Sequence, residues 1–154
     1  MTFVPFIIIG SVFLLDQLTK YLVCHFSSLL PFSVTSFFNI VFTQNRGMSF
    51  GLLNNSSSII FYLVTGVVIT LCGYLFYWLW KEKNKLIRLG LSAIIGGALG
   101  NLYDRFLRGG VVDFLDFHIQ SFHWPAFNVA DSFIFMGVVF LLWADITNKK
   151  QRVA

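Results

Sequence analysis

Four long apolar stretches divide this chain of 154 residues, and they restrict its possible folds more than any other feature of the sequence. A helix that crosses a bilayer needs about 20 mostly apolar residues, because its backbone groups must all be satisfied without water. Only 12% of the residues are charged and the mean hydropathy is +0.75, which excludes an ordinary soluble domain. The sequence therefore predicts an integral membrane protein with spans at residues 3–24, 59–80, 87–107 and 129–147.

Basic residues gather at two places, the joint at residues 81–88 and the tail at residues 149–152. The positive-inside rule places both in the cytoplasm, and with four spans the N-terminus lies there too. The net charge of +4 is explained by this topology and by contact with anionic membrane lipid, so no nucleic-acid partner is expected. The first stretch lacks a basic leader and a small-residue cleavage site, so we expect it to be a retained span and not a removed signal.

The segments at residues 26–58 and 108–128 should then face outward. Within them, residues 37–45 and 110–119 are rich in aromatic and β-branched side chains, which predicts two short strands. Such strands would form a small sheet at the membrane surface.

Regular strand alternation in the second of these segments would point Asp113 and Asp116 to opposite faces. A serine cluster within residues 51–60 is expected to cap the second span. Because no repeat or linker interrupts the chain, we predict one all-α membrane domain over residues 1–154. This is a four-helix bundle with a small outward-facing sheet-like element and loop.

Four aspartates within or beside the predicted spans are candidates for a function, because a charge at the bilayer centre costs at least roughly 2.5–3.5 kcal/mol. Two of them have a basic partner four residues further along a helix. Asp16 is followed by Lys20, and Asp104 is followed by Arg108. Local ion pairs therefore explain these two acids at least in part.

The other two acids, Asp113 and Asp131, are less easily explained. Asp131 stands three residues after Asn128 at the start of the fourth span, a spacing typical of a capping box. Capping alone would account for an acid at this position. Asp113 lies in the apolar segment "VVDFL" with no basic residue within two positions, so it needs a partner from elsewhere in the chain.

If Asp113 and Asp131 face each other, they form the kind of pair that aspartic proteases use. Two carboxylates about 4 Å apart repel by roughly 4 kcal/mol at an effective dielectric constant of 20, so near neutral pH they would share one proton. The ionised carboxylate can then take a proton from water, while the protonated one donates to the carbonyl oxygen under attack. This chemistry needs neither a metal nor a cofactor.

Other catalytic schemes have less support in the sequence. His25, His118 and His123 lack the spacing of zinc ligands, and no GxSxG motif surrounds a serine. Two alternatives to a peptidase stay open from the residues alone. One is a small proton-coupled transporter that uses the same acids, and the other is a structural membrane protein in which Asp131 only caps a helix.

Five blocks of the sequence, in order and spacing, resemble the signature blocks of the bacterial lipoprotein signal peptidases, the type II signal peptidases. The blocks are "DQLTK" at residues 16–20, "NRGMSFG" at 45–51, "GGALGNLYDR" at 96–105, "VVDFLDF" at 111–117 and "WPAFNVADS" at 124–132. Met48 and Ser49 differ from the small residues that many relatives carry there.

This resemblance implies an aspartyl endopeptidase of the bacterial inner membrane with its site near the periplasmic face. It would remove signal peptides from diacylglyceryl-modified prolipoproteins, cleaving on the N-terminal side of the lipidated cysteine. The resemblance makes Asp113 and Asp131 the catalytic pair. It also implies inhibition by globomycin-type cyclic peptides, and we expect a monomer. The residues that it implies as lining or supporting the site are Asn45, Asn101, Arg105, Asn128, Asp16 and Lys20.

Overall fold

A computed structural model describes residues 3–46 and 57–153. Four long helices run through these residues, and each contains a segment long and apolar enough to cross a membrane. They coincide with the four predicted spans, although the last helix continues well beyond residue 147. The helices are α1 (Val4–His25), α2 (Ser57–Lys81), α3 (Lys85–Arg108) and α4 (Val129–Val153).

Helix α3 is the central element of the bundle, since 67% of its apolar segment is buried against 11–22% for the other three helices. Its small residues allow this close packing. A Cβ atom on Gly96 would lie 2.8 Å from Cβ of Val12 in α1, and one on Gly90 would lie 2.8 Å from the carbonyl oxygen of Gly137 in α4. These glycines thus permit α1 and α4 to approach α3 closely.

The outer faces of the other helices carry large exposed apolar side chains, such as Ile7 on α1, Leu63 on α2 and Trp143 on α4. A soluble protein rarely exposes so many, whereas a lipid bilayer would cover them. The polar side chains of the site are instead turned inward, toward α3 and the sheet.

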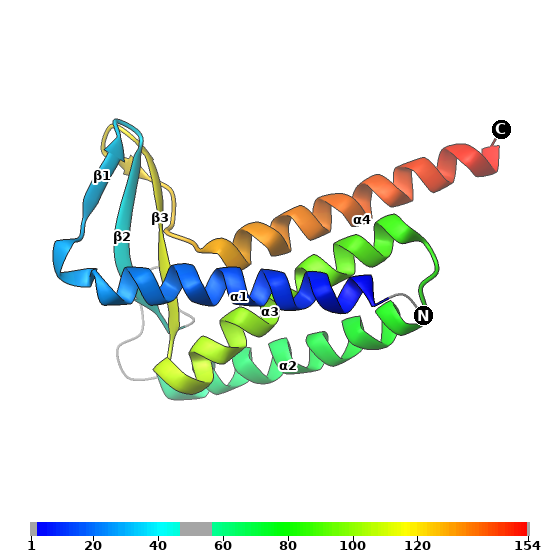
Figure 1. Cartoon of the computed structure of the whole chain (residues 1–154), viewed down its shortest axis with the longest axis horizontal. Coiled ribbons are helices and arrows are strands. Elements are labelled where there is room, and N and C mark those ends of the chain that lie inside the picture. The colour runs from blue at the N-terminus through cyan, green and yellow to red at the C-terminus, as the bar shows by residue number, and fades with distance from the viewer. Residues whose placement is uncertain (1–2, 47–56, 154) are drawn as a thin grey trace.

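A four-stranded antiparallel sheet lies at one end of the bundle (Figure 1). Its two longer strands, at residues 38–45 and 111–119, confirm the predicted segments, while its two shorter strands, at residues 32–35 and 122–123, were not predicted from the sequence. The opposite end holds the start of α1, the α2–α3 joint and the far end of α4. The serine cluster expected to cap α2 falls largely outside the described residues. The strands, in the order in which they pair, are β1 (Phe32–Thr35), β2 (Phe38–Asn45), β3 (Val111–Ile119) and β4 (Phe122–His123).

The expectation that Asp113 and Asp116 point to opposite faces is wrong, because both line one cavity. A β-bulge in β3 is the physical reason. The backbone N–H groups of Phe114 and Leu115 both donate to the carbonyl of Phe127, at 2.9 and 2.8 Å, so two residues of β3 oppose one residue of the segment before α4. The register with β2 also shifts, between Ile40 and Thr43. The extra residue breaks the alternation between the two aspartates.

Candidate active site

Asn128, directly before α4, links the two aspartates that the sequence singled out. Its side-chain oxygen accepts the Asp131 backbone N–H at 2.9 Å, and its own backbone N–H donates to Asp131 Oδ2 at 3.3 Å. This reciprocal pair is the predicted capping box. The amide nitrogen of the same side chain donates to Asp113 Oδ1 at 2.7 Å. One fully buried asparagine therefore caps the helix and holds both carboxylates.

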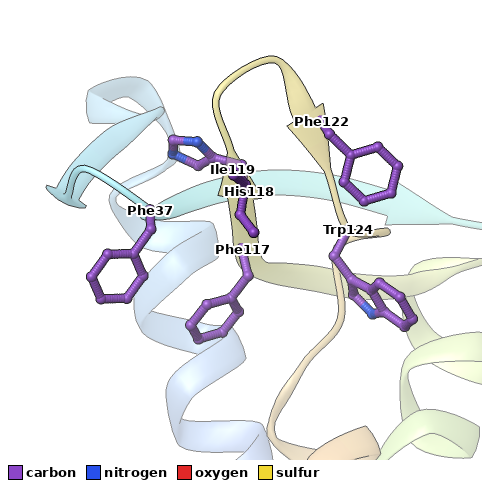
Figure 2. Close-up of a pocket in the computed structure, with 6 residues that line it drawn as sticks. All are labelled: Phe37, Phe117, His118, Ile119, Phe122 and Trp124. Atoms are coloured by element: carbon purple, nitrogen blue, oxygen red, sulfur yellow. The ribbon is translucent and has the colours of Figure 1, made fainter.

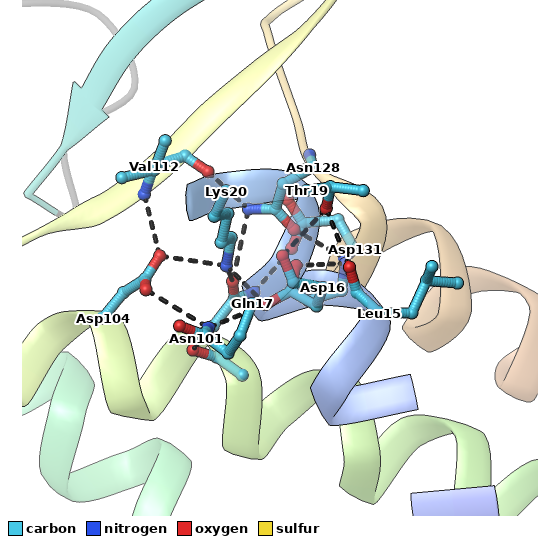
Figure 3. Close-up of polar contacts among 12 residues, drawn as sticks. Leu15, Asp16, Gln17, Thr19, Lys20, Asn101, Asp104, Val112, Asn128 and Asp131 are labelled. Atoms are coloured by element: carbon cyan, nitrogen blue, oxygen red, sulfur yellow. Dashed lines mark hydrogen bonds and ion pairs between the residues drawn. The ribbon is translucent and has the colours of Figure 1, made fainter. Parts of the chain in front are cut away.

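Asn101 of α3 supports Asp131 from the other side (Figure 3). Its Nδ2 donates to Asp131 Oδ1 at 2.8 Å, and its Oδ1 accepts from Asn128 Nδ2 at 3.2 Å. Lys20 Nζ donates to the same Asn101 oxygen at 2.8 Å. Because an ammonium can only donate, this bond orients the Asn101 amide with its N–H toward Asp131.

Lys20 is also the centre of a buried ion cluster. Its Nζ lies 2.9 Å from Asp16 Oδ2 and 3.0 Å from Asp104 Oδ2, and all three side chains are fully buried. Arg108 forms an ion pair with Asp104 through the carboxylate's other oxygen. Both predicted i,i+4 pairs are thus confirmed, but Lys20 joins them into a single network across α1 and α3.

The two acids of this cluster also hold backbone groups of the site. Asp16 Oδ1 accepts the Ala130 N–H at 2.9 Å, which fixes the first turn of α4. Asp104 Oδ2 accepts the Val112 N–H at 3.1 Å, directly before Asp113 in β3. The cluster therefore positions both chain segments that carry the candidate catalytic aspartates.

Gln17 is a member of this network that sequence reasoning did not single out. Its Nε2 donates to the Gly100 carbonyl at 3.1 Å and to Asp104 Oδ1 at 3.3 Å, while its Oε1 accepts from Arg108 at 3.1 Å. The only feature of the sequence that could have indicated a role for Gln17 is its place inside the "DQLTK" block.

Asp113 has amide partners and no ion pair within the described residues. Asn45, at the end of β2, donates from Nδ2 to Asp113 Oδ2 at 3.1 Å, opposite the bond from Asn128. Burial raises the pKa of Asp113 to about 6, with a further rise from the nearby Asp131 charge. The N–H donors of Asn45 and Asn128 act in the opposite direction. Asp113 thus retains its proton to a much higher pH than an exposed aspartate.

This pKa predicts a pH-dependent cost to stability that Asp113→Asn should remove. The folded protein binds the Asp113 proton more tightly than the unfolded chain does. The stabilisation that neutral Asp113 contributes to the folded protein is therefore fully present below pH 3.8 and is lost as pH rises through about 6. A pKa change of this size corresponds to about 3 kcal/mol. The variant should match wild type in thermal stability at pH 4 and exceed it above pH 6.5, as measured in detergent. A constant difference across this range would contradict the pKa.

Arg105 of α3 lies beside the aspartate pair without an ion pair among the described residues. Its NH1 reaches the Asn101 carbonyl at 3.4 Å, and its buried Nε has no hydrogen-bond partner in the described part of the chain. A buried guanidinium donor is costly to leave unsatisfied, which suits a group that awaits a ligand oxygen. The ion pair with Asp104 is formed by Arg108 and not by the adjacent Arg105.

Two cavities flank the β3–β4 region. One, of about 550 Å³, is lined by aromatic and aliphatic side chains such as Phe117 and Phe122 and contains no carboxylate (Figure 2). The other, of about 540 Å³, is bounded by residues 41–45 of β2 and residues 123–126, and both Asp113 and Asp116 line it. Of these two cavities, the second therefore reaches the candidate pair, through Asp113.

The predicted site residues converge from five parts of the chain. One chain of hydrogen bonds connects the two aspartates with the buried ion cluster. It runs through the side chains of Asn45, Asn128, Asn101 and Lys20. No side chain predicted for the site lies away from it. The resulting arrangement holds Asp113, a carboxylate with a raised pKa that lines an open cavity, near a second carboxylate, Asp131, and such a pair can carry out acid–base hydrolysis.

Comparison with known proteins identifies the family. Residues 8–147 match the family model described as signal peptidase (SPase) II. The chain is 40% identical to the lipoprotein signal peptidase of Aeromonas hydrophila over 147 residues, which cover 91% of this chain and 86% of the relative. It is 42% identical to that of Rickettsia conorii over 148 residues, 93% of this chain and 73% of the relative.

Two solved bacterial membrane enzymes share the fold. One, determined at 1.9 Å, has a TM-score of 0.75 and 32% identity, covering 92% of this chain and 91% of the other. The second, determined at 2.3 Å, has a TM-score of 0.74 and 30% identity, covering 96% and 90%. These likenesses favour the peptidase over the transporter and the structural protein. The chain belongs to the signal peptidase II family, a family of aspartic-type membrane peptidases.

Proposed function

We propose that this protein removes signal peptides from diacylglyceryl-modified prolipoproteins, cleaving on the N-terminal side of the lipidated cysteine. Asp113 and Asp131 would activate the attacking water. The observation that carries this proposal is the Asn128 side chain, which binds Asp113 through its amide nitrogen and the Asp131 backbone through its oxygen. A single rigid residue thus sets the relative position of the two acids.

The surroundings of the two carboxylates favour distinct roles. Asp131, which accepts N–H groups from Asn101 and from the Asn128 backbone, would be the base. Asp113, with its raised pKa, suits the acid. Asp131 would take a proton from water as the water oxygen attacks the scissile carbonyl carbon, while Asp113 donates to the carbonyl oxygen. The C–N bond then breaks, and the leaving amine takes up a proton.

The site's place in the fold fits a lipid-anchored substrate. Asp113 lies near the start of β3 and Asp131 in the first turn of α4, so the pair lies where the helices meet the sheet. A signal helix could then arrive sideways through the bilayer while its cleavage site reaches water. Arg105 and Asn45 would bind backbone oxygens around the scissile bond. We place the site at the periplasmic face of the inner membrane, with both termini in the cytoplasm, and expect a monomer that globomycin-type peptides inhibit by occupying the same cavity.

A cleavage assay tests this function. The purified protein in detergent should release the signal peptide from a prolipoprotein that carries the diacylglyceryl group. The same precursor with its cysteine replaced by serine cannot be modified, and it should stay intact. Equal cleavage of both precursors would refute the lipid requirement. Failure to cleave the modified precursor, together with pH-dependent ion flux in liposomes, would support a transporter instead.

A further inference from the structure

We propose that Asp116 is a specificity-determining residue that favours substrates with basic residues just after the modified cysteine and disfavours acidic ones. This inference rests on the function proposed above. It concerns the part of the substrate that remains on the lipoprotein, and it assigns a role to a carboxylate that the catalytic step does not use.

The position of the cavity decides which part of the substrate it would receive. The signal helix must remain in the bilayer, alongside the spanning helices. The polypeptide on the other side of the scissile bond must leave toward water. The 540 Å³ cavity is lined by Asp113 and Asp116 of β3, by residues of β2 and by residues 123–126, and its described lining includes no residue of the four helices. It therefore suits the residues that follow the cysteine.

The β-bulge places Asp116 in the wall of this cavity together with Asp113. Without that bulge, regular alternation would direct Asp116 to the other face of β3. An extended peptide advances about 3.3 Å per residue, so a side chain two or three positions beyond the scissile bond could reach the second carboxylate. A chain bound at the pair would thus pass Asp116 as it leaves.

Asp116 is held as a carboxylate. Asn39 Nδ2 donates to its Oδ2 at 3.0 Å, and the His123 Nδ1 lies 2.9 Å from its Oδ1. Although burial alone would raise the pKa of Asp116, these two contacts hold it below its ordinary value. Asp116 is therefore ionised at the pH at which Asp113 still carries its proton.

No lysine or arginine is among the residues that line this cavity in the described part of the chain. Its charged or titratable lining groups are Asp113, Asp116 and His123. The ring of His118 stacks on that of His123, with the ring centroids 4.8 Å apart, and His118 lines the apolar cavity. When both histidines are neutral, the wall has a net negative charge, which attracts a cationic side chain and repels an anionic one.

Two matched precursors test this role at pH 7, where Asp113 still binds its proton in part and histidine side chains are ordinarily mostly neutral. They differ only in the second and third residues after the modified cysteine, Lys-Lys in one and Glu-Glu in the other. Wild type should cleave the basic precursor with the higher kcat/KM. Asp116→Asn should lower the ratio of the two kcat/KM values by about fivefold, the size expected for a partly exposed ion pair. Asp145→Asn, an exposed acid of α4, should leave the ratio unchanged.

A second variant covers the case in which Asp116→Asn does not fold. Thr43 is an exposed β2 residue that lines the same cavity, and Thr43→Lys should also lower the ratio by adding a positive charge. An unchanged ratio in both variants would overturn the proposal. So would an equal loss of activity on both precursors, which would mean that Asp116 only fixes the sheet. If wild type cleaved neither precursor, the proposed function itself would fail.

Discussion

Asp113→Asn and Asp131→Asn should each reduce cleavage of the lipid-modified precursor by about 10⁴-fold or more. Asparagine preserves the size of the side chain and can still accept one hydrogen bond. It cannot take a proton from water, and it cannot transfer one to the carbonyl oxygen. Initial rates of signal-peptide release from purified protein measure this loss. Because the two carboxylates act as one unit, the double variant should be little slower than either single variant.

Asp145→Asn is the matched control for both substitutions, since it makes the same chemical change at an exposed position of α4. It should retain wild-type cleavage. The thermal midpoints of the inactive variants show whether they remain folded, and Asp113→Asn should be at least as stable as wild type at neutral pH. Substantial activity in either folded variant would exclude the carboxylate pair as the catalytic centre.

Lys20→Met should destabilise the protein by about 3–5 kcal/mol, the largest stability change that we expect for a single substitution. Methionine fills a similar volume, so packing is nearly preserved. The change removes the cation shared by Asp16 and Asp104, both of which are fully buried. Two carboxylates would then repel each other, and Arg108 would be the one counter-charge left to them among the described residues. Thermal or denaturant unfolding in detergent measures the loss.

Lys83→Met provides the control, because Lys83 is exposed in the joint between α2 and α3. Its effect should stay within about 0.5 kcal/mol. Adding Asp16→Asn to Lys20→Met should recover part of the lost stability, since it removes one of the two uncompensated charges. If Lys20→Met were as mild as Lys83→Met, the buried cluster would not be a main support of the site.

The capping box and both i,i+4 ion pairs could be predicted from the sequence because each depends on residues within one helical turn. Asn128 and Asp131 are three positions apart, and Asp16 and Lys20 are four apart. The role of Asn128 as the link to Asp113 could not be predicted in this way, since β3 and the start of α4 are brought together by the chain's turn through β4. The family resemblance named the members of the site, but the residues alone did not show how they bond.

The sequence by itself determined the membrane-spanning helices, the two longer strands and the local pairs. Apolar length and helical or strand periodicity act over a few residues, so neighbours along the chain are enough to specify them. Only the tertiary structure decided that Lys20 serves two buried acids at once and that Asp113 stands between Asn45 and Asn128. Only the tertiary structure, too, places Asp116 in the wall of the same cavity as Asp113. These features depend on the packing of distant segments and on the β-bulge at which Phe114 and Leu115 both donate to the Phe127 carbonyl. The alternation of residues within a single strand does not reveal where such a bulge lies.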